Sequence, residues 1–396
     1  MSLGSATGNA TRSALVIGLL LYCCLVPPGV ARVSPKPERA RDLGVPFEGE
    51  PGKLNAITDV HGIEVGHSTI VEGEGKLVVG EGPIRTGVTA ILPLGRARAN
   101  IPVPAAVFSL NGNGEMTGSA WVEESGFLEG PIVLTNTHSV GLVRDAVVEW
   151  GIKRFPGTGS FSLPVVAETW DGELNDINGF HVRKEHVFNA LDSASDGLVA
   201  EGNVGGGTGN KAFGLKGGIG TSSRLLSNNG SEVCVGVLVQ ANMSKRQNLV
   251  IAGVLVGKEI SDLQPVIHRE REKEGSILVI VATDAPLLPD QLKRVAKRAA
   301  LGVARTGAVS TNSSGDLFIA FTTAIPGMAG NKEQWSVLPN DQLDPVLSAT
   351  VEATEEAIVN ALLAAETMHG VNDNTFFALP HDRLREVLRK YNRLAK

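Results

Sequence analysis

The sequence predicts an α/β protein whose β-sheets are sandwiched between layers of helices. Strand-like segments outnumber long helices before a charged segment near residue 270, and both sides of that segment supply apolar strands to shared sheets. Glycine is abundant, with 47 residues, whereas aromatic residues make up only 5% of the chain. This composition suits closely packed layers joined by sharp turns. The pattern is less typical of a parallel doubly wound sheet, in which strands and helices alternate.

The first part of the chain carries a series of short strand signals. Two helices are expected among them, one over Thr137–Lys153 with valines at helical spacing and one starting near His186. Two apolar runs further on, EVCVGVLVQAN and NLVIAGVLVG, are expected to form adjacent strands, before a linker over Lys258–Gly275. The earlier strand candidates are GIEVGHSTIV, TGVTAILPL, PAAVFSLNG, GPIVLTN and LPVVAETWDG.

Helices and strands alternate more regularly after the linker. A buried strand is expected over Ile277–Ala282, a helix over Pro289–Ala304 and a strand over Leu317–Ala324. A long helix follows, with Asp344 expected to cap its N-terminus and Pro345 at the first helical position. The segment LPHDRLREVLRKY predicts a shorter final helix.

The N-terminus has the pattern of a secretory signal. Arg12 precedes the apolar run Ala14–Val26, and Gly29 and Ala31 form a small-x-small sequence. The run is shorter than the ~20 apolar residues of a membrane span, so we expect residues 1–31 to be a cleaved signal. An uncleaved anchor is the alternative. The prediction is an exported protein, periplasmic or secreted, without a stable membrane span once the signal is removed.

Several classes of function find little support. The net charge is −6 without a long basic run, which argues against nucleic acid as a partner. GNVGGGTGNK lacks the ending and spacing of a phosphate loop, so its glycines are expected to allow close backbone approach instead. The eight histidines form no local metal motif, and we expect neither metal nor organic cofactor. Cys234, in an apolar strand, is expected to be a core residue.

The junction Gly275-Ser276 is the most informative local feature. A run of charged or titratable residues, HREREKE, ends there, and the buried strand begins at Ser276. If the chain were cut before Ser276, the freed α-amine, with a pKa of about 8, could act as the base for the serine's own hydroxyl. The alternative is a linker that happens to end in Gly-Ser. Composition alone favours this alternative.

A resemblance reverses that preference. The segments LNAITDVHGIEVGH, PVVAETWDG, GNVGGGTGN, VGVLVQAN, EGSILVIVATDAPLLPDQL and RTGAVSTNSSGD resemble, in this order, the self-processing N-terminal-serine aminopeptidases. That family comprises the β-aminopeptidases and the L-aminopeptidase/D-amino-acid esterases and amidases. The resemblance implies an αββα four-layer sandwich, similar to N-terminal-nucleophile hydrolases but differently connected. It also implies autocleavage between Gly275 and Ser276 into subunits 32–275 and 276–396, which form one domain and assemble into a multimer.

The resemblance further implies a catalytic group. Ser276 matches the nucleophile, and Ser314 and Asp316 match the pair that orients its hydroxyl and amine. Asn242 matches the side-chain donor to the oxyanion, a kind of donor whose loss costs about 3 kcal/mol in known hydrolases.

Two further residues match the substrate pocket of that family. Glu168 matches the carboxylate that receives the substrate's free ammonium group, and Trp170 lies where the pocket wall varies. A buried carboxylate selects for a chain end because a substrate without that charge would leave it desolvated and unpaired.

The expected function is therefore that of a self-cleaving aminopeptidase or amidase acting on short peptides, amides or esters through an acyl-enzyme on Ser276. An acyltransferase similar to ornithine acetyltransferases is one alternative, and a non-catalytic secreted binding protein with the same fold is another. The sequence leaves open whether the N-terminal residue of the substrate is an L-α, D-α or β-amino acid.

Overall fold

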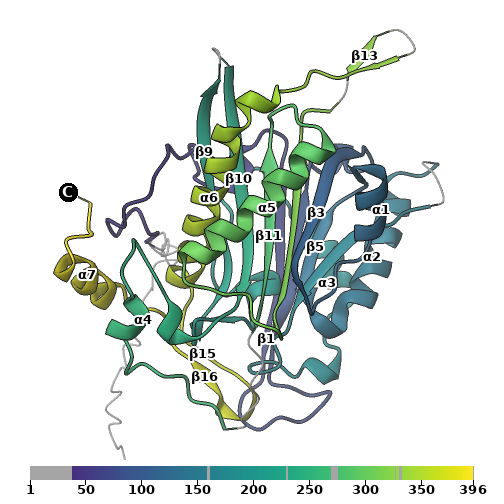
Figure 1. The fold of residues 1–396 in the computed structure, drawn as a ribbon. Helices are drawn as coiled ribbons and strands as arrows, with labels where there is room; N and C mark the ends of the chain where they lie inside the picture. Colours follow the sequence, from purple (N-terminus) through teal and green to yellow (C-terminus); the bar gives the residue numbers. More distant parts are fainter. Residues whose placement is uncertain are drawn as a thin grey trace, which may run out of the picture. The chain divides into compact units, whose positions relative to one another are not determined.

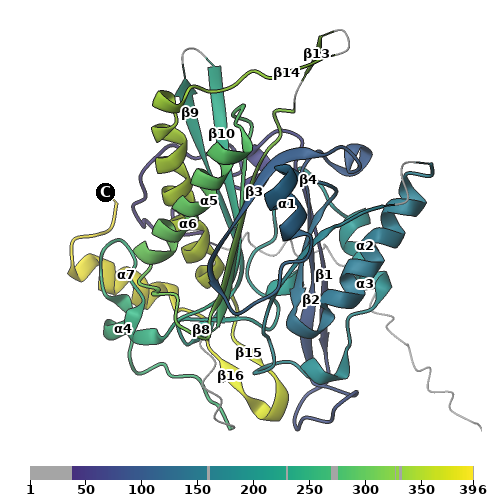
Figure 2. The same cartoon turned by 45° about the vertical axis from the view of Figure 1, so that its right-hand side comes forward.

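The computed structural model describes residues 38–157, 161–228, 231–268, 275–325, 327–329 and 332–395, and Figures 1 and 2 show the fold from two sides. The predicted signal over residues 1–31 and most of the charged segment before Gly275 lie outside the described residues. None of the described helices has the length and apolar character of a membrane span.

Two β-sheets form the centre of the molecule. The smaller sheet has the order β1-β2-β5-β6, and only its β5–β6 pair is parallel. The larger sheet has the order β4-β3-β12-β11-β10-β9, and only its β11–β12 pair is parallel. The strands of the smaller sheet are β1 (Glu64–Glu72), β2 (Ile84–Leu92), β5 (Ile132–Asn136) and β6 (Val165–Thr169). Those of the larger sheet are β3 (Val103–Gly112), β4 (Phe127–Leu128), β9 (Gly218–Asn228), β10 (Ser231–Asn242), β11 (Ser276–Thr283) and β12 (Gly315–Thr322).

Helices cover the outer face of each sheet. α2 (Val140–Arg154) and α3 (Lys184–Asp192) pack on the smaller sheet, and α5 (Pro289–Arg305) and α6 (Asp344–Leu363) pack on the larger one. Figure 2 shows the resulting layers nearly edge-on. One hydrophobic cluster fills the space between the two sheets, and one lies under each helical layer. The αββα sandwich predicted from the resemblance is therefore confirmed.

Smaller elements connect these layers. They are α1 (Ser119–Ser125), α4 (Val256–Glu259), α7 (His381–Lys390) and the short strands β7 (Lys211–Ala212), β8 (Leu215–Lys216), β13 (Gly327–Ala329), β14 (Lys332–Gln334), β15 (Met368–His369) and β16 (Thr375–Phe376). The remaining turns are 3-10 helices at Ile57–Asp59, Arg96–Arg98, Thr137–Ser139, Ile177–Gly179, Gly205–Gly207, Arg246–Asn248, Asn340–Gln342 and Val371–Asp373.

Two sequence-based expectations about local structure were wrong. The run NLVIAGVLVG is not a strand, because the chain turns back on itself at Ala252 and Gly253, where φ is positive, and then enters α4. Its apolar residues still enter the core, as Ile251 and Val254 are buried beneath the outer helices. Asp344 does not cap α6, because Leu343 is already helical and the Asp344 side chain makes no capping hydrogen bond. It lies in the first turn, where a negative charge favours the helix dipole.

Strand β9 was missed because its sequence, GIGTSSRLLSN, is polar. The four polar side chains from Thr221 to Arg224 are nevertheless buried, and each has a partner. The Thr221 hydroxyl donates to the Val237 carbonyl at 2.6 Å, and Arg224 forms an ion pair with Glu356 at 2.8 Å. Tertiary partners, rather than an apolar pattern, place this strand in the sheet.

The glycine cluster brings two sheets close together, as expected. A Cβ on Gly206 would lie 2.8 Å from the Leu134 carbonyl oxygen, and a Cβ on Gly207 would lie 2.6 Å from the Ile219 amide nitrogen. Such distances are too short for any side chain, so the backbone packs directly against β5 and β9.

Candidate active site

Ser276 is the first residue of β11, and its side chain is 6% exposed. The Gly315 N–H, at the start of the adjacent parallel strand β12, donates to Ser276 Oγ at 3.2 Å. On the other side, Asn242 at the end of β10 is the register partner of Ser276. The ends of three neighbouring strands therefore fix the position of this hydroxyl.

Asp316 lies beside Ser276 and is held by three donors. The Ile277 N–H donates to Asp316 Oδ1 at 3.2 Å, the Ser314 hydroxyl donates to the same oxygen at 2.5 Å, and the Ser310 hydroxyl donates to Oδ2. Burial raises the pKa of Asp316, and these hydrogen bonds oppose the rise. The structure thus brings Ser314 and Asp316 next to the start of the strand that Ser276 opens, with the Ser314 hydroxyl bonded to Asp316.

The loop before β12 is fixed by two asparagines from the end of β3. The Asn113 side-chain amide donates to the Ser313 carbonyl at 2.7 Å, and the Asn111 amide donates to the Thr311 carbonyl at 3.1 Å and to the Ser314 carbonyl. Sequence reasoning missed both asparagines, as it missed Ser310. The two asparagines act across about half the chain, so no local spacing could have indicated them. Ser310 is local, since it lies six residues before Asp316.

Glu168 is the second site residue that the structure places clearly. It lies near the end of β6, is 3% exposed, and accepts hydrogen bonds from the Glu115 N–H at 3.0 Å and from the Thr137 hydroxyl. Burial raises its pKa above the usual value, and these two bonds oppose the rise. Within the described residues no Lys, Arg or His forms an ion pair with this carboxylate. A buried carboxylate in this setting favours a cationic ligand.

Ser276 and Glu168 open into one cavity of about 340 Å³. Trp170 forms part of its wall. Gly275 also reaches the cavity, so the predicted cleavage junction and the predicted ammonium site share one space. The remaining lining residues are Gly112, Asn113, Gly114, Glu115, Thr137 and Ser313.

The Asn242 side chain bonds to neighbouring backbone groups rather than opening into the cavity. Its side-chain nitrogen donates to the Trp170 carbonyl at 2.9 Å, and its oxygen accepts from the Lys211 N–H at 3.0 Å. It is not among the residues that line the cavity. In this uncut chain Asn242 therefore joins β10 to the Trp170 turn and to β7, beside the residue that it was predicted to assist.

Gly275 allows no side chain. A Cβ added there would lie 1.4 Å from the Asn242 carbonyl oxygen. We expect Gly275→Ala to prevent or strongly slow cleavage of the Gly275–Ser276 bond, because β10 would have to move away from the junction. The fraction of cut chain on a denaturing gel measures this. Gly141→Ala, at a helical glycine with open space around it, should leave cleavage unchanged, and rapid cleavage of Gly275→Ala would contradict the expectation.

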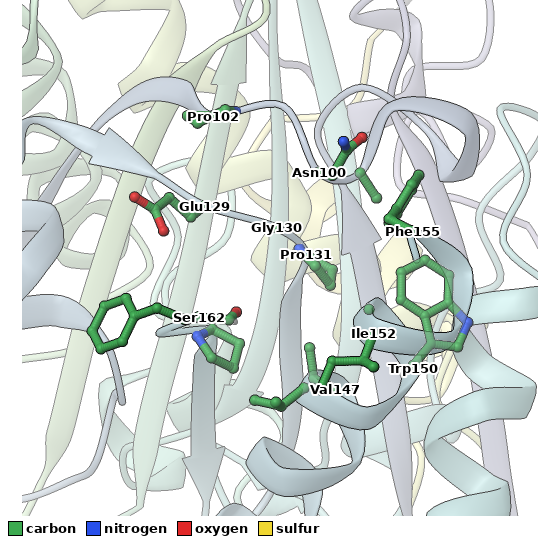
Figure 3. A pocket seen from close by; sticks show the side chains of 15 residues that line it. Asn100, Pro102, Glu129, Gly130, Pro131, Val147, Trp150, Ile152, Phe155 and Ser162 are labelled. Carbon is green, nitrogen blue, oxygen red and sulfur yellow. The ribbon is translucent and has the colours of Figure 1, made fainter. Parts of the chain in front are cut away.

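A second hollow lies away from these residues, at the C-terminal end of α2 (Figure 3). Its volume is about 230 Å³, and its wall includes Trp150, Ile152 and Phe155. Glu129 is the one acidic or basic side chain among its described lining residues. The hollow therefore lacks the paired groups that hydrolysis requires.

Cys234 and the potential metal ligands are the other candidates among the described residues. Cys234 is 3% exposed, and burial raises the pKa of its thiol, which confirms the expected core role. No group of three or more His, Cys, Asp or Glu side chains in the described part of the chain has an arrangement that could hold a metal ion.

Comparison with known proteins assigns the chain to a family. The model of peptidase family S58 matches residues 55–376. The chain belongs to this family. A beta-peptidyl aminopeptidase, BapA of Sphingosinicella microcystinivorans, is 50% identical over 96% of this chain and 98% of its own length. A second BapA, from Sphingosinicella xenopeptidilytica, is 47% identical over 94% of this chain and 96% of its own length.

Solved structures of family members share the fold. The L-aminopeptidase D-Ala-esterase/amidase of Ochrobactrum anthropi, described as a prototype of the serine aminopeptidases and a variant of the Ntn hydrolase fold, is 47% identical with a TM-score of 0.85. The match covers 91% of this chain and all of that one. A Burkholderia sp. beta-aminopeptidase is 44% identical with a TM-score of 0.81, over 89% and 99% of the two chains. The expected family is confirmed, and this S58 member is a hydrolase of the serine aminopeptidase class.

Proposed function

We propose that this aminopeptidase cuts its own chain between Gly275 and Ser276 and then removes N-terminal residues from short peptides, amides or esters. The observation that carries the proposal is the shared cavity, in which Ser276 and the unpaired carboxylate of Glu168 face one substrate. The proposed subunits are residues 32–275 and 276–396.

Self-cleavage would begin with attack of Ser276 Oγ on the Gly275 carbonyl carbon. The C–N bond breaks as the ester forms, the Ser276 nitrogen gains a proton, and water then hydrolyses the ester. The products are a Gly275 carboxylate and a free Ser276 α-amine. The absence of a side chain at Gly275 supports this step, because nothing on that residue obstructs the neighbouring hydroxyl.

Peptide hydrolysis would use the same hydroxyl. The freed α-amine of Ser276, with an ordinary pKa of about 8, takes the hydroxyl proton as Oγ attacks the carbonyl of the substrate's first residue. The bond to the leaving amine or alcohol breaks, the leaving group takes that proton, and water then hydrolyses the acyl-enzyme to release the free amino acid. Asp316 and Ser314 act as positioning groups, since Asp316 holds the Ile277 N–H next to the amine. Asn242, the register partner of Ser276, is the proposed side-chain donor to the oxyanion. In the uncut chain its amide nitrogen donates to the Trp170 carbonyl, so this role needs the second N–H of that nitrogen.

Glu168 would identify the chain end of the substrate. Its carboxylate is buried and lacks a cationic partner in the described residues, so a substrate ammonium group would neutralise it. We assign a preference for N-terminal β-amino acids, supported by the two beta-peptidyl aminopeptidases at 50% and 47% identity. The 47% identical L-aminopeptidase D-Ala-esterase/amidase makes L- and D-alanyl substrates the necessary comparison.

Four chromogenic anilides test the proposal: β-alanyl, L-alanyl, D-alanyl and N-acetyl-β-alanyl. The β-alanyl compound should give the highest kcat/KM, and acetylation should lower it about 100-fold, because Glu168 would then be buried without a cation. Faster cleavage of the L-alanyl or D-alanyl compound than of the β-alanyl compound would refute only the proposed β preference. Equal cleavage of the acetylated and free β-alanyl compounds would refute the proposed binding of the ammonium group by Glu168.

We also propose that residues 1–31 direct export to the periplasm or medium, and that the two-chain units assemble into a multimer. The N-terminal sequence of the mature larger chain, read from the exported fraction, tests the first part. It should begin after Ala31. Retention of Met1 in membrane fractions would indicate an anchor instead.

A further inference from the structure

A larger groove of about 700 Å³ lies beside the cavity that Ser276 and Glu168 line. Gly112, Gly114 and Glu115 line both spaces, so the loop that follows β3 borders the cavity on one side and the groove on the other. One side of the groove is formed by α1 and another by α5. Its other lining residues are Val107, Phe108, Ser109, Met116, Ser119, Ala120, Glu123, Lys293, Lys297, Leu317 and Phe318.

The groove lies along an open edge of the larger sheet. β3 pairs with β12 from Ala105 to Gly112, but on its other side β4 pairs only with Val103 and Pro104. From Val107 to Gly112, no strand in the described part of the chain pairs with this outer edge. Ser109 is exposed there. Such an edge offers backbone donors and acceptors to an extended peptide.

The edge has a length that suits a few peptide residues. Gly315, whose N–H contacts Ser276 Oγ, is opposite Gly112, and Phe318 is opposite Phe108. Three steps along β12 separate Gly315 from Phe318, or about 10 Å at 3.3 Å per residue. Two or three residues of an extended peptide cover that distance.

Positive charge lies at the distant end of this edge. Lys293 forms an ion pair with Glu123 at 2.6 Å, so these two charges balance. Lys297 is exposed, and its Nζ lies 5.8 Å from the centre of the Phe108 ring. Among the described residues it has no ion pair. A carboxylate at the end of a short peptide would meet this charge.

We propose that the leaving part of the substrate binds in this groove by adding a strand to the edge of β3, with its C-terminal carboxylate near Lys297. This inference rests on the proposed function, because it places the residues that follow the bond attacked by Ser276. The preferred substrates would then be short peptides of about three or four residues with a free C-terminus, in addition to simple amides.

Substrates methylated on backbone nitrogen test the strand addition in the unmodified enzyme. A tetrapeptide is compared with analogues that carry one N-methyl group at the first or second amide after the cleaved bond. Because alternate residues of a strand face the same neighbour, one position should lower kcat/KM at least about tenfold and the next position only slightly. Equal effects at both positions, or none, would overturn the strand addition.

The carboxylate contact is tested with Lys297→Gln beside Arg298→Gln, a neighbour that does not line the groove. Lys297→Gln should lower kcat/KM for a tripeptide acid about threefold to fivefold, the size that an exposed ion pair supports, and the loss should vanish for the tripeptide amide. High salt should reduce the difference. An equal loss with acid and amide, or with Arg298→Gln, would contradict the contact.

A β-alanyl anilide separates this inference from the proposed function. The anilide has no peptide on the leaving side, so all these variants should cleave it at the wild-type rate. Loss of anilide cleavage by the wild-type enzyme would refute the proposed function itself. Normal anilide cleavage with no alternation among the methylated peptides would refute only the groove.

Discussion

Ser276→Ala is expected to lower kcat by about 10⁴-fold or more, the size seen when a hydrolase loses its nucleophile. The mutation removes a hydroxyl that opens into the cavity lined by both Gly275 and Glu168. It should also leave the chain uncut. Activity on a β-alanyl anilide measures the first effect, and thermal unfolding checks that the protein is folded.

Ser313→Ala provides the matched control. Ser313 lines the same cavity, and its carbonyl rather than its hydroxyl holds the loop through Asn113. Removal of the Ser313 hydroxyl should change kcat by less than about threefold, because a surface substitution of this size has only a small energetic effect. Similar losses in both variants would mean that Ser276 is not the nucleophile.

Glu168→Gln is expected to lower kcat/KM about 10- to 100-fold for substrates with a free amine, because a neutral amide cannot balance a buried ammonium group. Cleavage of the Gly275–Ser276 bond should continue, since that bond has no free amine on its acyl side. The ratio of free to N-acetylated substrate cleavage is the measurement. Glu129→Gln, at the acidic residue of the separate hollow, should leave the ratio unchanged.

The pH dependence of ligand binding gives this carboxylate a second readout. Burial raises the pKa of Glu168 above its usual value of 4.5. Only the ionised form attracts a cation, so binding of a competitive amino alcohol should weaken as the pH falls through that raised pKa. The amine of the ligand stays protonated over this range. The Glu168→Gln variant should bind the amino alcohol weakly at every pH. If the wild-type enzyme bound it equally well across this pH range, Glu168 would not be the ammonium site.

The sequence predicted the site residues that short motifs carry, and it missed those that act through tertiary contacts. A charged segment that meets an apolar strand at a Gly-Ser bond drew attention to Ser276, and the family resemblance decided its predicted role. Asn111 and Asn113 carry no such signal. Asn113 and Ser313 meet although they lie 200 residues apart in the chain, and only the pairing of β3 with β12 brings them together.

The same distinction applies to the fold. Strands with buried apolar runs, such as β11, were predicted nearly to the residue. β9 was missed because its buried polar side chains depend on partners in β10 and α6, which no local pattern shows. NLVIAGVLVG was predicted as a strand because its residues are apolar. It became a turn and a short helix because Gly253 permits the positive φ that reverses the chain.

Intact mass measurement of the purified active enzyme under denaturing conditions shows whether the chain is cut. We expect two chains whose masses place the cut between Gly275 and Ser276, so that the smaller chain begins with Ser276. Ser276→Ala should give a single chain. One uncut chain in fully active wild-type enzyme would contradict the account, because Ser276 would then have no free amine to activate its hydroxyl.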